Sequence, residues 1–368
     1  MTSEIIVRTE KGEYVGGDML YGCVYLRVLE QLQCTFLKLV IRGYEISEYD
    51  YTYIEEQEEG EAIVPKTRKR TARKDIVKFE SKLIEYPGGF PAGDFAFAFM
   101  QQLPAGIPGV FTLNHVDPGG KSWEGLIRYS VSAQLEPSAA SEQRLGAEVP
   151  VVVYDNIHCK NPSVPPDDQT ATGSVKTFFC ISRGSVQVTV GLKRSAYDIT
   201  DKIPVTVLIR NDSSSEVSGC TVKLIRIIKL LGTDRTKLEE QLTANTLFDT
   251  IAEMVQEGCP RGATVRRDVD LDLTRFAIGI GIPPSCSGSI VKCSYIVDVD
   301  VHIPWAPDIE VRHMLTIRPP TNTMWSDWRP PSWISNCTQV PVLGPCSVPP
   351  DITSSHTFSG MPGFQPLL

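Results

Sequence analysis

Carboxylates at alternate positions are the residues in this sequence whose types and spacing suit metal chemistry. Asp298, Asp300 and His302 alternate with valines in YIVDVDVHI, and DVDLDL repeats the pattern from Asp268 to Leu273. Strand residues two apart share one face, and carboxylates suit hard cations. The glycine and the final glutamate of an EF-hand loop are absent, so we interpret both rows as solvated faces opposite apolar ones. No metal site and no cofactor are predicted.

Catalytic motifs are the second kind of chemistry to consider. The sequence contains no GxSxG elbow, no HExxH pair and no Walker-type glycine–lysine loop. Its five histidines lie far apart along the chain. We therefore predict a protein without enzymatic activity.

A charged segment, EEQEEGEAIVPKTRKRTARK, places five acidic residues before six basic ones. The basic residues are Lys66, Arg68, Lys69, Arg70, Arg73 and Lys74. Such a cluster suits anionic lipid headgroups or receptor phosphates. It also suits a long hairpin loop whose two arms neutralise each other, and the sequence leaves both interpretations open.

Composition and charge limit the classes of partner. The 368 residues carry a net charge of −8, so a global basic field for nucleic acid is absent and no nucleic-acid partner is predicted. The N-terminus lacks the basic and apolar regions of a secretory signal, and no stretch approaches 18 continuous apolar residues. The ten cysteines include no CxxC pair. These features predict a cytoplasmic protein with free thiols.

Strict alternation of apolar and polar residues dominates the chain and predicts strands. YGCVYLRVLE, LIRYSVSAQL, VQVTVGL and IPVTVLIRN are examples, and turn-forming residues separate them. Many short strands of this kind predict antiparallel β-sandwiches. The segment Thr236–Gly258 is ambiguous, because its good helix formers and roughly helical apolar spacing predict a helix, while its alternation also fits a strand.

A weak internal repeat divides the chain into two similar halves. GGDMLYGCVYLRV followed by CTFLKLVIRGYE corresponds to AYDITDKIPVTVLIRN followed by CTVKLIRIIKL. We predict sandwiches over residues 1–156 and 173–320, joined by a polar, proline-rich linker over residues 157–172. After Pro320 the alternation stops, and residues 321–368 are predicted to be a disordered tail rich in proline, serine and glycine.

The order of these motifs resembles the arrestin family, and most of all the α-arrestins, or arrestin-domain-containing proteins. The first half carries LKLVIRGYE and PAGDFAFAFMQQLPAGIPGVF, and the second carries RGSVQVTVGLKRSAYDITDKIPVTVLIRN and FAIGIGIPPSCSGSIVKCSYIVDVDVHI. The resemblance covers nearly all of residues 1–320. It implies an all-β fold of two tandem arrestin-like, immunoglobulin-type sandwiches. Phe95, Phe97 and Phe99 then point inward, and Leu103-Pro104 and Ile107-Pro108 turn the chain at the sandwich rim.

The resemblance also implies a function. It predicts a cytoplasmic adaptor, peripherally associated with the plasma membrane or endosomes, that links the cytoplasmic tails of membrane proteins to endocytic trafficking and ubiquitination machinery. α-Arrestins typically carry PPxY motifs that dock the WW domains of HECT-type ubiquitin ligases. This chain has Pro330-Pro331-Ser332-Trp333 instead, with tryptophan in the tyrosine position. Trp325 and Trp328 are further candidate anchors for a partner, and recruitment of a ligase is not secured by the motif.

Two alternatives remain beside the adaptor. A retromer-type coat subunit for endosomal sorting shares the two-sandwich fold and needs no ligase. An extracellular adhesion sandwich would carry a signal peptide and disulfides, and neither is evident in the sequence.

Overall fold

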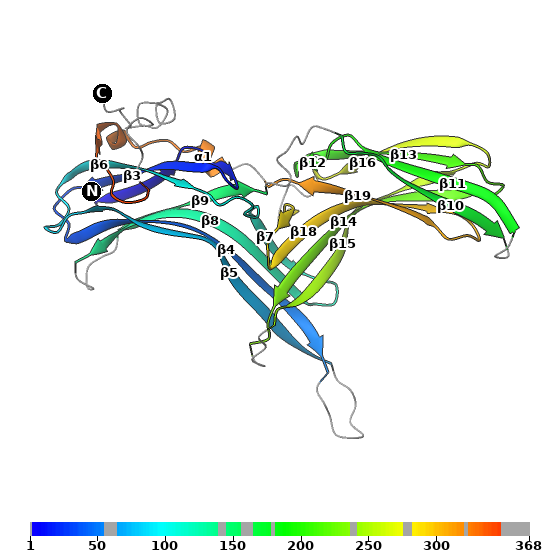
Figure 1. Ribbon diagram of the computed structural model, residues 1–368, viewed down its shortest axis with the longest axis horizontal. Helices are drawn as coiled ribbons and strands as arrows, with labels where there is room; N and C mark the ends of the chain where they lie inside the picture. The colour runs from blue at the N-terminus through cyan, green and yellow to red at the C-terminus, as the bar shows by residue number, and fades with distance from the viewer. Residues whose placement is uncertain are drawn as a thin grey trace, which may run out of the picture.

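The structure is a computed structural model, and it describes residues 2–54, 65–138, 145–155, 165–177, 181–235, 241–274, 282–319 and 323–346. Two β-sandwiches lie side by side, and long hairpins of both reach across the region between them (Figure 1). This confirms the predicted all-β fold of two tandem sandwiches. None of the helices in the described part of the chain is long and apolar enough to cross a membrane.

The first sandwich packs a sheet of order β1-β3-β6-β20 against a sheet of order β2-β9-β8-β4-β5, with β7 paired to β8. Neighbouring strands are antiparallel except β2 with β9 and β20 with β6. The strands of the repeat are β1 (Glu4–Thr9), β2 (Glu13–Val15), β3 (Met19–Val28), β4 (Cys34–Tyr53), β5 (Lys66–Glu85), β6 (Gly93–Gln102), β7 (Phe111–Val116), β8 (Ser122–Pro137) and β9 (Gly146–Tyr154).

The second sandwich repeats the arrangement of β1 to β9, with β10 rather than a counterpart of β20 as its added edge strand. Its sheets have the orders β10-β11-β13-β16 and β12-β19-β18-β14-β15, with β17 paired to β18. The strands are β10 (Gln169–Thr177), β11 (Ile181–Leu192), β12 (Ala196–Tyr197), β13 (Lys202–Asn211), β14 (Val217–Gly232), β15 (Thr243–Cys259), β16 (Thr264–Asp272), β17 (Cys286–Ser287), β18 (Val291–His302) and β19 (Ile309–Ile317). Strands β11 to β19 correspond in order and pairing to β1 to β9, as the internal repeat predicts.

The structure settles one ambiguous prediction from the sequence and differs from another. Strand β15 pairs with β14 along most of its length, so the ambiguous segment is extended from Thr243 onward. Strand β10 begins at Gln169, inside the segment predicted to be a linker. Pairing with β11 supplies backbone partners there that a solvated linker would not need.

The proline corner of the first sandwich has the predicted form. Phe97 and Phe99 are fully buried, and the ring of Phe99 lies where a side chain on Gly22 would be. The Tyr129 hydroxyl, from β8, donates to the carbonyl oxygen of Pro108 at 2.7 Å and pins the corner. The second sandwich repeats the bond, from Tyr295 to Pro283.

The segment after the second sandwich is folded against the first, contrary to the predicted disorder of the tail. Helix α1 (Thr323–Ser326), the 3₁₀ helix η3 (Ser332–Asn336) and β20 (Thr338–Gln339) cross the β1-β3-β6 sheet. Strand β20 then pairs in parallel with β6. The correction applies to residues 323–346, because residues 347–368 lie outside the described part of the chain.

An apolar outer face on the first sandwich explains this packing. Cys23 and Tyr25 on that face are fully buried, and they pack with Ile334 and Trp333, whose exposed fractions are 0% and 5%. The Trp333 indole Nε1 donates to Glu4 at 3.1 Å. Burial of this apolar surface outweighs the entropy of ordering the segment, which composition alone does not reveal.

Charged groups fix the same segment at two further points. The Arg8 guanidinium lies 4.3 Å from the ring centroid of Trp325 and 4.6 Å from that of Trp328. The Arg27 guanidinium lies 4.9 Å from the Trp333 ring centroid and forms a two-point pair with Asp94 at 2.8 Å. Cation–π contacts of this kind stabilise a packed ring by about 0.5–2 kcal/mol.

Replacing Trp333 by alanine tests this packing. Trp333→Ala should lower the free energy of unfolding of the first sandwich by about 3 kcal/mol, because a large buried ring leaves a cavity. Denaturant unfolding followed by tryptophan fluorescence and circular dichroism measures the change. The matched control is Trp305→Ala, since Trp305 is 96% exposed and its loss should change stability by no more than about 0.5 kcal/mol. Equal effects of the two substitutions would contradict the packing.

Candidate interaction surfaces

The six basic residues predicted to contact lipid or phosphate lie on β5, in a strand rather than a loop. Residues Lys66 to Lys74 pair with Tyr53 to Glu45 of β4. The acidic arm that precedes them lies outside the described residues. The hairpin-loop interpretation is therefore wrong for the basic arm, which is a paired strand. In TRKRTA, exposed and less exposed side chains alternate as in a strand, but because most of them are charged or polar, the sequence shows no apolar alternation.

The structure divides the six basic residues into two sets. Arg68 and Arg70 lie over the rings of Tyr53 and Tyr51, at 4.3 Å and 4.0 Å from the ring centroids. Arg68 also lies 3.6 Å from the buried carboxylate of Asp234, in the second sandwich. These two arginines belong to the contact between the sandwiches and are not displayed to a ligand.

The other four basic side chains are exposed, and they are Lys66, Lys69, Arg73 and Lys74. Lys69 forms an ion pair with Glu48, and the Arg73 guanidinium lies 4.4 Å from the ring centroid of Tyr44. The predicted anion-binding cluster is thus reduced to the solvent-facing part of β5.

A row of polar side chains on β4 joins the two sandwiches. Leu37, Leu39 and Ile41 face the core of the first sandwich, and the residues that continue their row are polar. Each of these contacts the second sandwich, and they are Glu45, Ser47, Tyr49 and Tyr51. Ser47 donates to the carbonyl oxygen of Leu231, Tyr49 to that of Thr243, and Tyr51 to the carboxylate of Asp234.

Glu45 is the most strongly bonded member of this row. It is 2% exposed. Its carboxylate accepts hydrogen bonds from the backbone N–H groups of Ser289, Ile290 and Val291 at 3.0, 2.8 and 3.2 Å, and from the Ser289 hydroxyl at 2.9 Å. A side chain on Gly288 would come within 2.6 Å of this carboxylate, so the turn requires glycine.

A second carboxylate of the first sandwich holds the same turn. Asp155 is buried and accepts from the backbone N–H of Ser287 at 2.9 Å and from its hydroxyl. The turn between β17 and β18 is therefore bound by two acidic side chains from the other sandwich. Charge-assisted bonds to backbone N–H groups fix orientation as well as distance.

The functional residues predicted from the sequence do not include this row. The signal is present in YEISEYDYTY, where the inward-facing positions change from apolar to polar while the strand continues. A polar row on a buried face indicates partners elsewhere in the chain, because unpaired polar groups are costly to bury. Finding those partners requires the tertiary structure.

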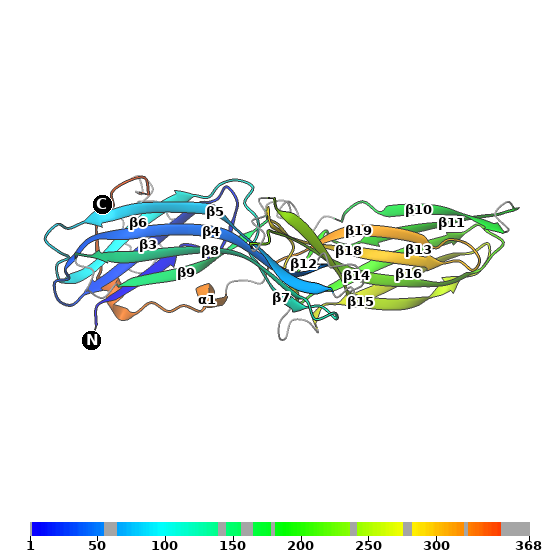
Figure 2. The same cartoon turned by 90° about the horizontal axis from the view of Figure 1, so that it is seen from below.

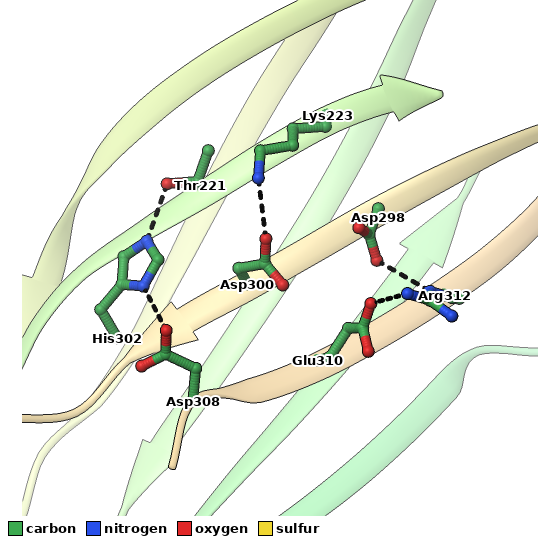
Figure 3. Close-up of polar contacts among 8 residues, drawn as sticks. All are labelled: Thr221, Lys223, Asp298, Asp300, His302, Asp308, Glu310 and Arg312. Atoms are coloured by element: carbon green, nitrogen blue, oxygen red, sulfur yellow. Dashed lines mark hydrogen bonds and ion pairs between the residues drawn. The ribbon is translucent and has the colours of Figure 1, made fainter. Parts of the chain in front are cut away.

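The candidate metal ligands on β18 form an ion-pair network with residues of β14 and β19 (Figure 3). Asp298, Asp300 and Glu310 have oxygens within 4.8 Å of one another. Lys223 lies 3.0 Å from Asp300, and Arg312 pairs with both Asp298 and Glu310. These cations already supply opposite charge to the three carboxylates.

His302, the third predicted member of this row, lies apart from the carboxylate group. Its Nδ1 lies 3.0 Å from Asp308 and its Nε2 lies 2.9 Å from the Thr221 hydroxyl (Figure 3). The row DVDLDL lies on β16, with Val269 and Leu271 buried and its aspartates directed outward. The predicted solvated face fits β16, whereas on β18 the carboxylate of Asp298 is buried.

The predicted tail anchors are placed together on the first sandwich. Pro330 is exposed and Pro331 is half-buried, while Trp333 is buried beneath Arg27. Trp325 and Trp328 flank Arg8. A partner domain that reads Pro330-Pro331-Ser332-Trp333 would therefore have to displace Trp333 from the sheet.

Comparison with known proteins agrees with this architecture. The family model for the arrestin (or S-antigen) N-terminal domain matches residues 3–157, and that for the C-terminal domain matches residues 182–320. The chain belongs to the arrestin family. It is 23% identical over 363 residues to arrestin domain-containing protein A of Dictyostelium discoideum, which confirms the resemblance to arrestin-domain-containing proteins. The match covers 97% of this chain and 56% of that relative, so the chain spans just over half the relative's length.

Replacing Glu45 by alanine should weaken the contact between the sandwiches. Three backbone N–H groups, two of them buried, lose their acceptor, which should cost about 3 kcal/mol of stability. Hydrogen exchange should show faster exchange at Ser289, Ile290 and Val291, measured by mass spectrometry on the intact protein. Glu148→Ala, at an exposed position on β9, is the control and should leave this exchange unchanged. Unaltered exchange in Glu45→Ala would contradict the role of the carboxylate.

Asp298 should make stability depend on pH. Burial raises the pKa of Asp298, and the neighbouring carboxylates Asp300 and Glu310 add to the rise. A raised pKa means that its stabilising contribution is complete below the unfolded pKa, about 4, and is lost as pH rises through the folded pKa. Asp298→Asn should therefore gain stability relative to the unaltered protein as pH rises from about 4 to 7.

Asp268 provides a control of opposite sign. Hydrogen bonding to Arg266 lowers the pKa of Asp268, so its contribution is present above the unfolded pKa and is lost as pH falls through the folded pKa. Asp268→Asn should lose stability relative to the unaltered protein as pH rises from about 2 to about 4, which lies below the window of Asp298. Thermal unfolding at a series of pH values measures both variants, and trends of the same sign would contradict the assignment.

Proposed function

We propose that this protein is a non-enzymatic adaptor that binds the cytoplasmic segments of membrane proteins and links them to endocytic trafficking and ubiquitination machinery. The supporting observation is the fold of the whole described chain, two arrestin sandwiches held in one orientation by the β4 row. A fixed pair of sandwiches presents two sheet faces and their loops to one partner. Simultaneous contacts of this kind gain affinity through effective concentration.

The exposed part of β5 suits the membrane side of this function. Lys66, Lys69 and Lys74 extend from a long hairpin that projects beyond the first sandwich (Figure 1). Basic side chains near an anionic membrane surface each contribute about 1 kcal/mol of attraction. The proposal therefore includes peripheral association with the plasma membrane or endosomes.

Residues 323–346, which pack on the first sandwich, affect the ubiquitination part of the proposal. Recruitment of a HECT-type ligase through Pro330, Pro331 and Trp333 requires the segment to leave the sheet, because the indole is buried. The similarity to a protein named as arrestin domain-containing supports the adaptor over a coat subunit. The alternative to the adaptor is a coat subunit for endosomal sorting.

Capture of partners by the full chain tests the adaptor. Crosslinked pull-down from cytosol with membranes, read by mass spectrometry, should recover membrane proteins with trafficking or ubiquitin-ligase components. Trp333→Ala, which removes the aromatic of the candidate docking motif, should lose the ligase and keep the membrane proteins. Recovery of endosomal coat subunits by both proteins, without a ligase, would overturn the adaptor in favour of a coat role.

Binding to vesicles tests the membrane contact separately. The full chain should sediment with vesicles that contain anionic phospholipid, and a Lys66→Glu, Lys74→Glu double variant should bind about tenfold more weakly. A Lys193→Glu, Lys202→Glu double variant, with the same change of charge at exposed positions of the second sandwich, is the matched control and should bind as the unaltered protein does. Equal sedimentation of all three proteins would exclude β5 as the contact.

A further inference from the structure

The outer face of one sheet in the second sandwich carries an exposed apolar patch. Strands β19, β18, β14 and β15 run side by side in this sheet (Figure 2). The register places Met314 opposite Ile296, and Ile296 opposite Ile225. Ile227, two residues further along β14, lies opposite Phe248. Because residues opposite each other share a face, these five side chains form one surface, defined here as the β14–β18 patch.

The β14–β18 patch is exposed to solvent on both sides. Phe248 is 67% exposed and Met314 is 69% exposed, whereas the three isoleucines between them are partly buried. Adjacent strands lie about 4.8 Å apart, so a patch that crosses four strands is about 15 Å wide. An exposed apolar patch with a polar border is typical of an interaction site.

The common plan of the two sandwiches does not require this patch. The corresponding sheet of the first sandwich contains β4, β5, β8 and β9, and none of the exposed large apolar side chains of the described chain lies on these strands. The outer face of that sheet carries ion pairs instead, such as Lys38 with Glu80 and Arg128 with Glu148. The exposed apolar side chains of the patch are therefore specific to the second sandwich.

Charge differs between the two borders of the patch. On one border lies the network of Figure 3, in which Lys223 and Arg312 pair with carboxylates, so the charges there offset one another. On the other border, Lys229 of β14 lies directly opposite Lys292 of β18. Both lysines are exposed, and neither forms an ion pair with a carboxylate of the described residues. Like charges directly opposite each other destabilise a sheet, and an anion placed between them offsets the repulsion.

We propose that the β14–β18 patch and this lysine pair bind a cytoplasmic segment of a membrane protein in which carboxylates lie next to bulky apolar side chains. The apolar side chains of the segment cover Ile227 and Ile296, and its carboxylates lie between Lys229 and Lys292. Residues two apart on a strand are about 7 Å apart, so the acidic and apolar groups of the segment have a similar separation. In assigning the segment to a membrane protein, the inference rests on the adaptor function proposed above.

The size and the charge of the surface favour a short acidic segment over other occupants. A membrane surface would also cover the opposite border, where carboxylates outnumber cations and repel anionic lipid, namely Asp298, Asp300 and Glu310 against Lys223 and Arg312. A second copy of the chain needs more area, because each partner in a stable dimer buries roughly 800 Å². A short segment reaches the lysine pair without covering the acidic border.

A fluorescently labelled peptide provides the direct test. It carries two glutamates followed by two leucines, with one serine between successive members, and a second peptide has the reverse order because a segment can run either way along β14. Fluorescence anisotropy with the full chain should show binding of at least one of them. Glutamine in place of both glutamates should weaken that binding about tenfold. Failure of both peptides to bind would overturn the inference.

Charge substitutions on the protein test the lysine pair. A Lys229→Glu, Lys292→Glu double variant should bind the peptide at least about tenfold more weakly than the unaltered protein. The matched control is the Lys193→Glu, Lys202→Glu double variant, which makes the same change of charge at exposed positions elsewhere on the second sandwich. Circular dichroism checks that both variants are folded. Equal binding by the two double variants would overturn the role of the lysine pair.

A single apolar substitution tests the patch itself. Phe248→Ser should weaken peptide binding about tenfold, because the peptide loses an apolar contact. Leu208→Ser, at an exposed apolar position of β13 in the other sheet, is the control and should bind as the unaltered protein does. Unchanged binding by Phe248→Ser would place the peptide elsewhere and overturn the inference.

Two further measurements distinguish the other occupants. Light scattering should give the same mass for the unaltered chain and for Phe248→Ser, and a dimer that the substitution dissociates would assign the patch to a second copy. The Lys229→Glu, Lys292→Glu variant should sediment with anionic phospholipid vesicles as the unaltered protein does. Loss of vesicle binding by this variant, without peptide binding by the unaltered chain, would assign the lysines to a membrane surface. Either result would overturn the inference.

The same double variant separates this inference from the adaptor proposal. Membrane proteins captured by the unaltered chain and lost from the Lys229→Glu, Lys292→Glu variant support both. Equal capture by the two proteins, with equal peptide binding, would refute the patch and leave the adaptor intact. Absence of membrane proteins from the unaltered chain would refute the adaptor, while the peptide measurements would still decide whether the patch binds an acidic, apolar segment.

Discussion

The buried carboxylate of Glu45 is the interaction on which the arrangement of the molecule depends. Its oxygens accept from three consecutive backbone N–H groups of the second sandwich, and hydrogen bonds of this kind constrain direction as well as distance. Ser47, Tyr49 and Tyr51 extend the contact along β4. The two sandwiches consequently meet through a row of polar side chains whose bonding fails if either sandwich rotates.

The hairpin of β4 and β5 shows why the charged surface of this molecule follows from the structure and not from the sequence alone. Arg68 and Arg70 stack on tyrosines and face the second sandwich, whereas their neighbour Lys69 is exposed on the opposite side. Alternation along a strand separates adjacent basic residues into two different environments. A run of positive charge in the sequence therefore becomes one structural contact and one smaller exposed surface.

Edge strands are where the two sandwiches depart from their common plan. Strand β10 adds to the edge of the second sandwich next to β11, and β20 adds to the opposite edge of the first next to β6. Each addition supplies partners for backbone groups that an edge leaves open. The first sandwich also needs a cover because Cys23 and Tyr25 make its outer face apolar, while aspartates make the face of β16 polar.

The alternation of apolar residues determined the strands and the two-sandwich fold, because inward-facing side chains must recur every second residue. The motif order similarly indicated the family. Three features depended on tertiary structure: the folding of Trp333 onto the sheet, the partners of Glu45, and the cations beside Asp298 and Asp300. In each case the stabilising contacts join groups far apart in sequence. The local pattern of a proline-rich tail or a polar strand therefore does not identify the residues that it contacts. Sequence periodicity specifies which face is buried, and only the assembled fold specifies what buries it.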